Sequence, residues 1–222
     1  MSFSIKENLH HFKKDLASNV TLLAVSKTKP VALLQEAYDA GQRDFGENKV
    51  QELRDKHPLL ASDIRWHMIG HLQTNKVKYI APFIYMIHSV DSIKLLEEIN
   101  KRALSAGRKI RVLIQVHVAE EEEKFGFDMD EIRSLFSKEF IDSFPNIIFC
   151  GLMAMATFTE DKDQIRSEFM KVKKAFDTIK NKFPELTEFN ELSMGMSNDY
   201  QIAIEEGSTM IRIGSSIFGS RK

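Results

Sequence analysis

Short apolar runs alternate with longer amphipathic stretches along the whole chain of 222 residues. The apolar runs are typical of strands buried on both faces, and the stretches between them have the spacing and end signals of helices. Eight runs have this strand character, at residues 21–28, 43–48, 64–70, 85–92, 109–118, 147–155, 189–197 and 210–219. Strands that alternate with helices predict parallel βα units, and eight such units close into a single (β/α)8 TIM barrel with the helices outside.

Caps and stops mark the helices between these runs. One helix opens with Pro30, has Thr28 upstream as a candidate cap, and closes at Gly41. Asp128 stands three residues before Glu131, which is the spacing of a capping box. Further helices are expected over residues 1–16, 91–107, 160–183 and 198–207. The first of these precedes the first strand and is an extra N-terminal helix.

Size and composition narrow the class of protein. The length suits one α/β domain with a full core, so residues 1–222 are expected to form one domain. The 31 Lys and Arg against 32 Asp and Glu give a formal net charge of -1, so nothing in the charge balance indicates an electrostatic nucleic-acid binder. The lone cysteine, Cys150, excludes an internal disulfide and a Cys-rich zinc site, and we expect it in the core. Without a membrane span or a signal peptide, we expect a cytoplasmic protein.

The active site of such a barrel is built at the C-terminal ends of the strands. That rule turns the strand prediction into a list of candidate side chains. The first strand ends at Lys27. The other strands offer Glu47, Asn48, His67, Gly70, His71, His88, Ser89, Asp91, Met153, Met155, Thr157, Ser193, Met194, Gly195, Met196, Ser197, Arg212, Gly214, Ser215 and Ser216.

Lys27 ends a buried strand at the point where a helix begins. A desolvated lysine costs free energy unless it is paired or its pKa falls. Two interpretations are open for the residue alone. Either its amine reaches water or a carboxylate, or it forms an imine with a carbonyl compound.

The loops after the seventh and eighth strands have features of a phosphate site. Ser197 offers a hydroxyl before a helix, the amides of Gly214 and Ser215 can point at an anion, and Arg212 brings a fixed positive charge. Each feature alone has an ordinary structural explanation, such as a strand end, a helix cap or a surface ion pair. Together, and with Lys27 in the same barrel mouth, they favour a ligand that bears both an aldehyde and a phosphate. Pyridoxal 5'-phosphate fits, and a sugar-phosphate aldolase is the alternative.

Five segments in order along the chain carry a resemblance to a known family. They are LLAVSKTKP, FGENKVQE, WHMIGHLQTNK, SMGMSNDYQIAIEEGST and IRIGSSIFG. They resemble the signatures of the YggS/PROSC family of pyridoxal 5'-phosphate homeostasis proteins, and the match covers nearly the whole chain. The resemblance implies a barrel of the alanine racemase N-terminal type, a largely monomeric protein and a cofactor held on Lys27.

The resemblance also assigns roles around the cofactor. It implies that Arg212 faces the pyridine nitrogen and that Ser197, Gly214 and Ser215 hold the phosphate. It further implies that Asn48 and the segment containing His67 line the pocket around the ring, and Met194 completes the predicted cofactor-binding set. Two of these have simpler explanations as well. His67 can be a core histidine bonded to a neighbouring strand, with Trp66 on the opposite face under a helix, and Met194 can be core filling.

The residues also bear on catalysis. Racemisation needs a base on each face of the substrate carbanion. Lys27 can serve one face, but no positioning partner is evident for His67, His71, His88 or Tyr200. We also expect no second domain after the last strand to close the pocket.

These considerations predict no catalytic residue and no metal site. An arginine beside the pyridine nitrogen makes the ring a weaker electron sink than an aspartate would. We therefore predict a carrier that buffers the cofactor, with transient contact to apo-enzymes. The alternatives are a pyridoxal-phosphate-dependent amino-acid racemase and a regulatory protein whose bound cofactor reports vitamin B6 status.

Overall fold

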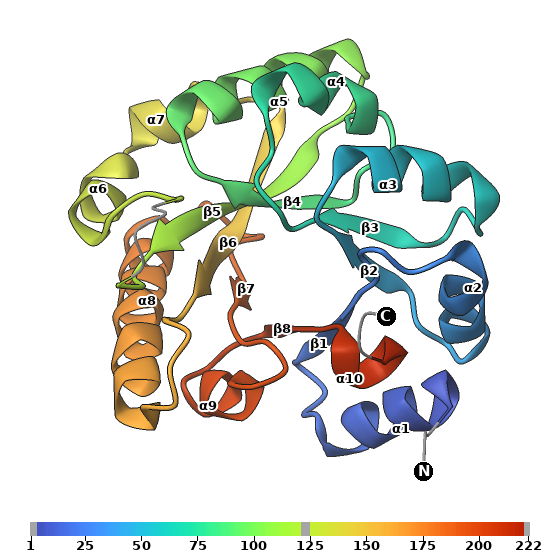
Figure 1. The fold of residues 1–222 in the computed structure, drawn as a ribbon. Helices are drawn as coiled ribbons and strands as arrows, with labels where there is room; N and C mark the ends of the chain where they lie inside the picture. Colours follow the sequence, from blue (N-terminus) through green and yellow to red (C-terminus); the bar gives the residue numbers. More distant parts are fainter. Residues whose placement is uncertain (1–3, 121–124, 220–222) are drawn as a thin grey trace.

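The computed structural model describes residues 4–120 and 125–219. Within these residues, eight parallel strands pair in sequence order and close into a barrel (Figure 1). The strands are β1 Thr21–Val25, β2 Asp44–Glu47, β3 Arg65–Met68, β4 Met86–Val90, β5 Ile110–His117, β6 Ile147–Met155, β7 Glu191–Ser193 and β8 Met210–Ile213. Each predicted apolar run contains one of them, so the predicted (β/α)8 TIM barrel is confirmed.

Helices surround the barrel and connect each strand to the next (Figure 1). They are α1 Ile5–Asp15, α2 Val31–Asp39, α3 Val50–Lys56, α4 Val77–Ile80, α5 Ile93–Ser105, α6 Met129–Leu135, α7 Lys138–Asp142, α8 Lys162–Lys182, α9 Tyr200–Glu205 and α10 Ser215–Phe218, with 3-10 helices η1 His57–Leu59 and η2 Thr74–Lys76. The extra helix α1 buries Ile5, Leu9 and Phe12 and packs against α2 and α10. The predicted capping box of Asp128 and Glu131 is present at α6. In the described part of the chain, no helix combines the length and apolarity needed to cross a membrane.

Two local predictions are wrong. Thr28 does not cap α2, because Pro30 is the N-cap residue and Thr28 itself has a φ angle of 63°. The eighth strand ends at Ile213 and does not extend to residue 219, because residues 215–218 turn into helix α10. Both differences fall at the C-terminal ends of strands.

Side chains along each strand alternate between an outer and an inner core. Trp66 and Met194 face outward and pack in the large apolar cluster between barrel and helices. An inner apolar cluster is formed by Leu23, Met86, Leu113, Cys150, Met153 and Met210. Cys150 is buried there as predicted, and desolvation raises the pKa of its thiol to about 12. The thiol is therefore protonated and unreactive at neutral pH.

At Gly151, strand β6 passes close to the backbone of β7. The φ angle of Gly151 is 149°, and it pairs with Glu191 across the sheet. A Cβ atom at this position would lie 1.7 Å from the backbone oxygen of Glu191. Only glycine therefore permits this pairing.

We expect Gly151→Ala to reduce the free energy of unfolding by at least about 3 kcal/mol, because the new methyl group would push two paired strands apart. Gly41→Ala is the matched control. Gly41 also has a positive φ angle, 87°, but no atom lies within 4 Å of an added Cβ. Its replacement should cost only about 1 kcal/mol of backbone strain. Equal losses in chemical denaturation would show that the close approach is not the constraint.

Candidate functional site

A cleft of about 510 Å³ opens at the C-terminal ends of the strands. Its wall is built from residues at or just after the ends of β1, β2, β3, β6, β7 and β8. Six of the eight predicted cofactor-binding residues lie in this wall, namely Lys27, Asn48, Ser197, Arg212, Gly214 and Ser215. The structure thus brings together residues from both ends of the chain.

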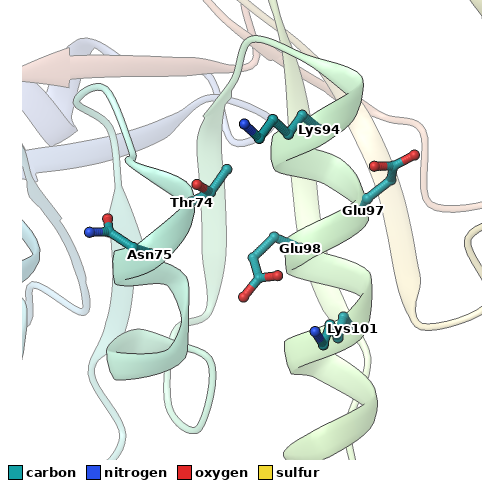
Figure 2. A pocket seen from close by; sticks show the side chains of 6 residues that line it. All are labelled: Thr74, Asn75, Lys94, Glu97, Glu98 and Lys101. Carbon is teal, nitrogen blue, oxygen red and sulfur yellow. The ribbon is translucent and has the colours of Figure 1, made fainter.

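Another hollow, of about 410 Å³, lies on the outside of the molecule between η2 and α5 (Figure 2). It is lined by Thr74, Asn75, Lys94, Glu97, Glu98 and Lys101. All six are at least partly exposed, and the two lysines offset the two glutamates. The cleft at the strand ends is the stronger candidate because it combines a lysine with a buried cation.

Arg212 supplies that buried cation. It points inward from β8 and is held by the two preceding strands, β6 and β7. One guanidinium nitrogen, Nη1, donates to the backbone oxygen and to Oγ of Ser193, both at 2.7 Å, and Nη2 donates to the backbone oxygen of Ala154 at 2.9 Å. Burial lowers the pKa of Arg212 to about 10, with the charge of Asp199 acting in the opposite direction. The side chain therefore stays charged and fixed in place at neutral pH.

A row of buried side chains continues from Arg212 through the barrel. Ser193 Oγ lies 3.2 Å from Nδ1 of His88. The other ring nitrogen of His88, Nε2, lies 2.9 Å from Nδ1 of His67. At the far end, Nε2 of His67 lies 3.1 Å from a carboxylate oxygen of Asp44. We call this row, from Asp44 to Arg212, the interior chain.

One direction of donation satisfies every atom of the interior chain. The Asp44 carboxylate can only accept, so His67 donates to it from Nε2. A neutral His67 then accepts at Nδ1 from His88, which in turn accepts at Nδ1 from the Ser193 hydroxyl. Desolvation, with a smaller contribution from the charge of Arg212, lowers the pKa of His88 well below its ordinary value, in keeping with a neutral ring. The interior chain therefore fixes the tautomers of both histidines.

These contacts correct the expectation that the histidines have no positioning partners. His67 and His88 are bonded to each other inside the barrel, and His71 lies 2.8 Å from a carboxylate oxygen of Asp91. Tyr200 packs edge-on against Phe12 of α1. None of these four side chains is among the residues that line the cleft in the described structure.

His67 and Met194 are the predicted cofactor-binding residues that the structure leaves outside the cleft wall. His67 is completely buried below the cleft, with its ring in the interior chain. Met194 is completely buried in the outer apolar cluster, because Ser193 before it faces inward. These positions agree with the simpler explanations, in which His67 is a core histidine and Met194 fills the core.

Asp199 is a residue of the cleft that the sequence analysis did not single out. Its carboxylate accepts from the amide of Met196 at 2.5 Å, and its own amide donates to the Met196 oxygen. Burial raises the pKa of Asp199, while the hydrogen bond from Met196 and the charge of Arg212 act to lower it. Gly195 has a φ angle of 91° and lets this loop pass close to Ala203. A Cβ atom added at Gly195 would lie 2.6 Å from the Cβ of Ala203. The loop so held presents Ser197 to the cleft.

Two glycines let other loops approach the cleft. A Cβ atom at Gly70 would lie 2.5 Å from the backbone oxygen of Asn48, and one at Gly214 would lie 3.2 Å from that of Val25. Gly214 is the N-cap of α10 and, having no side chain, makes no side-chain cap hydrogen bond to the amides of its first turn. The start of α10 therefore offers backbone donors where Ser215 enters the cleft wall.

The chain was compared with known proteins. The model of the family described as alanine racemase, N-terminal domain, matches residues 3–222. A pyridoxal phosphate homeostasis protein of Aquifex aeolicus is 41% identical over 202 residues, which covers 90% of this chain and 87% of that protein. A human protein of the same name is 40% identical, covering 90% of this chain and 76% of its own length.

Solved structures give the same result. PipY of Synechococcus elongatus with PLP bound has a TM-score of 0.90 and 35% identity, covering 97% of this chain and all of that one. An alanine racemase of Corynebacterium glutamicum has a TM-score of 0.72 at 15% identity, which shows a common fold over 60% of its length. The barrel and its cleft are thus of the alanine racemase N-terminal type. Within that class, the chain belongs to the family of pyridoxal phosphate homeostasis proteins.

The interior chain leads to a pH prediction for Asp44. Burial acts to raise the pKa of Asp44, but Arg65 and His67 outweigh it and lower the pKa from 3.8 to about 2. A carboxyl whose pKa is lower in the folded chain stabilises the fold above its unfolded pKa, and this contribution is lost as the pH falls from 3.8 towards 2. We expect Asp44→Asn to cost about 2 kcal/mol at neutral pH and progressively less as the pH falls below about 4.

Urea denaturation of both proteins across this pH range measures the difference. Asp63→Asn is the control, because the Asp63 side chain is 55% exposed and pairs with Arg43 on the surface. A surface pair of this kind contributes at most about 1 kcal/mol. A pH-independent difference between wild type and Asp44→Asn would contradict the assignment.

Proposed function

We propose that this protein binds pyridoxal 5'-phosphate in the cleft, holds it as an imine on Lys27, and buffers and carries the cofactor in vitamin B6 homeostasis without catalytic turnover. The observation that carries the proposal is the meeting of Lys27 with Arg212, Ser197 and the Gly214–Ser215 turn in one cleft wall. The names of the relatives and the PLP bound to PipY support the choice of ligand.

The donor set fits each part of the cofactor. The aldehyde requires an amine, which Lys27 supplies. The phosphate requires several donors, which the hydroxyls of Ser197 and Ser215 and the backbone at the start of α10 supply. The pyridine nitrogen is an acceptor, and Arg212 is a permanent donor that cannot give up its proton at neutral pH. The bound cofactor would supply a reactive aldehyde and an electron-withdrawing ring to this site.

The same residues favour a carrier over a racemase. Arg212 beside the pyridine nitrogen would leave that nitrogen unprotonated, and the ring would then withdraw fewer electrons from a bound amino acid. His67 and His88 are locked in the interior chain, and His71 is engaged by Asp91. Besides Lys27 and Arg212, the ionisable side chains in the described part of the cleft wall are Lys29 and Asp199, and these are engaged by the Gly219 oxygen and the Met196 amide.

The proposal extends to the state of the protein in the cell. We infer that residues 1–222 act as one domain, as a cytoplasmic monomer that meets apo-enzymes only transiently. The resemblance to the homeostasis proteins supports these inferences. A half-buried lysine in an open cleft suits such a role, because an incoming amine can reach an imine formed there.

Lys27→Ala should abolish the visible absorbance of the imine and leave no cofactor attached to the protein after borohydride reduction. The matched control is Lys29→Ala, since Lys29 lines the same cleft and its amine donates to the Gly219 oxygen at 2.9 Å. Mass spectrometry of the reduced proteins should find the adduct on Lys27 in wild type and in the control. An adduct on another lysine would refute the anchor, and a protein that takes up no pyridoxal phosphate would refute the function.

The carrier role is tested separately with amino acids. Wild-type protein should change its absorbance when an amino acid replaces Lys27 on the cofactor, yet form no opposite enantiomer on chiral chromatography. Sustained formation of the D-enantiomer, lost in Lys27→Ala, would establish the racemase in place of the carrier.

The phosphate contacts predict how the site discriminates between pyridoxal phosphate and pyridoxal. Replacing Ser197 and Ser215 together by alanine should lower the affinity for pyridoxal phosphate about tenfold, because two hydrogen bonds to a charged group are lost. The affinity for pyridoxal should hardly change. Absorbance titrations with both aldehydes measure the ratio, and an equal loss for both would contradict these phosphate contacts.

A further inference from the structure

The turn that carries Lys27 has a strained backbone. Thr28 has a φ angle of 63° and is the one non-glycine residue with a positive φ angle in the described part of the chain. A β-branched residue rarely adopts this conformation. Such strain persists where surrounding contacts over-determine the backbone, and it is concentrated at functional sites.

Helix α3 holds this turn on both sides of Lys27. The amide of Thr28 donates to a carboxylate oxygen of Glu52 at 2.7 Å. The ammonium group of Lys56 donates to the backbone oxygen of Ser26 at 2.9 Å. The residues before and after Lys27 are therefore both tied through their backbone to one helix.

A buried carboxylate completes this arrangement. The three donors of Lys56 go to Ser26, to Glu47 at 2.8 Å and to Glu52 at 2.7 Å. The Ser26 hydroxyl also donates to Glu47, at 2.6 Å. The side chains of Glu47 and Lys56 are 0% and 9% exposed. We call Glu47, Glu52 and Lys56 the turn clamp.

The turn clamp is costly to build. Two carboxylates share one ammonium group, and Oε2 of Glu47 is buried without a hydrogen-bond partner. A buried ion pair often adds no stability over an apolar contact of the same size. Its contacts with both neighbours of Lys27 indicate a role in geometry rather than in stability.

We propose that the turn clamp positions the Lys27 amine for attack on the aldehyde of its ligand, a step in which a C=N bond replaces the C=O bond and the aldehyde oxygen leaves as water with the two amine protons. By fixing Ser26 and Thr28, it directs the Lys27 side chain into the cleft before the ligand arrives, so that binding does not have to order the turn. None of the three clamp residues lines the cleft, so they act through Lys27 as positioning residues. The proposal rests on the proposed function for the identity of the ligand.

The clamp makes two ligands behave differently. Pyridoxal phosphate needs the amine of Lys27 in the correct place, whereas pyridoxine phosphate has no aldehyde and uses only the rest of the cleft. We expect Glu52→Ala to weaken the binding of pyridoxal phosphate about tenfold, because relaxing one strained residue changes an equilibrium constant by about that factor. The binding of pyridoxine phosphate should weaken less than about twofold. A merely structural role for Glu52 would weaken both ligands equally.

Thr28→Asn supplies the rescue. Asparagine accepts a positive φ angle more readily than threonine, so the turn needs less support. In the double variant Glu52→Ala/Thr28→Asn, the affinity for pyridoxal phosphate should return to within about threefold of wild type, because the two sites are coupled. Glu98→Ala is the matched control, as Glu98 pairs with Arg102 on α5 and touches no part of the turn.

Absorbance titration and competition with pyridoxine phosphate measure the two affinities. Glu52 is 20% exposed, so its removal leaves the core intact, and Glu52→Gln provides a milder variant that keeps an acceptor for Thr28. Equal weakening of both ligands, no weakening, or no rescue by Thr28→Asn would overturn the proposal.

Amide hydrogen exchange at Thr28 separates this proposal from the function on which it rests. Exchange should be protected in wild type and faster in Glu52→Ala, with or without a ligand. If wild type forms no imine on Lys27 but Thr28 is protected by Glu52, the proposed function fails and the clamp stands. If Thr28 is unprotected in wild type, the clamp fails.

Discussion

The structure depends on placing the charge of Arg212 inside a barrel. A guanidinium group removed from water must give its protons to acceptors, and the nearest acceptors belong to Ser193 and Ala154 on the two preceding strands. The hydroxyl of Ser193 then donates to His88, His88 donates to His67, and His67 donates to the carboxylate of Asp44. Inward positions that could have held apolar side chains are occupied by polar ones for this reason. Each proton in this row has a single acceptor, so the charges of Arg212 and Asp44 at its two ends determine the direction of every hydrogen bond between them.

The candidate site has a rigid side and a reactive side. The rigid side is built on β8 and the loop after β7, where Arg212 and Asp199 are fixed by several hydrogen bonds each. The reactive side is the turn after β1, where Lys27 is half-buried between two tethered neighbours. In the proposed function, phosphate and ring contacts would select the ligand, and the imine on Lys27 would determine how long the ligand stays bound. Reversible covalent attachment suits a carrier, because a competing amine can release the cargo without unfolding the site.

Much of this arrangement could be predicted from the sequence, for physical reasons. Apolar runs separated by helical stretches are sufficient to predict eight strands, and the barrel rule then places Lys27, Asn48, Ser197, Arg212, Gly214 and Ser215 at one end. The strand-end rule does not say which face a residue presents, and at the end of β7 the inward position belongs to Ser193, whereas Met194 lies in the outer apolar cluster. The interior chain depends on the register between strands, and the clamp depends on how α3 faces β1. Neither can be read from spacing along the chain. An ion pair between Glu52 and Lys56 could have been predicted, since the two residues are four apart on a helix.

Lys27 follows the first strand, β1, and Arg212 lies on the last described strand, β8, and these two strands pair directly through Leu23 and Arg212. The two residues that define the cleft are therefore separated by almost the entire chain and become neighbours only when the barrel closes. A growing polypeptide has no such site until its final strand has left the ribosome and joined the first. Any ligand that needs both residues can bind only closed barrels, and by mass action it shifts the population of chains towards closure. A ligand held by both residues would thus link the first and last strands and stabilise the closed barrel.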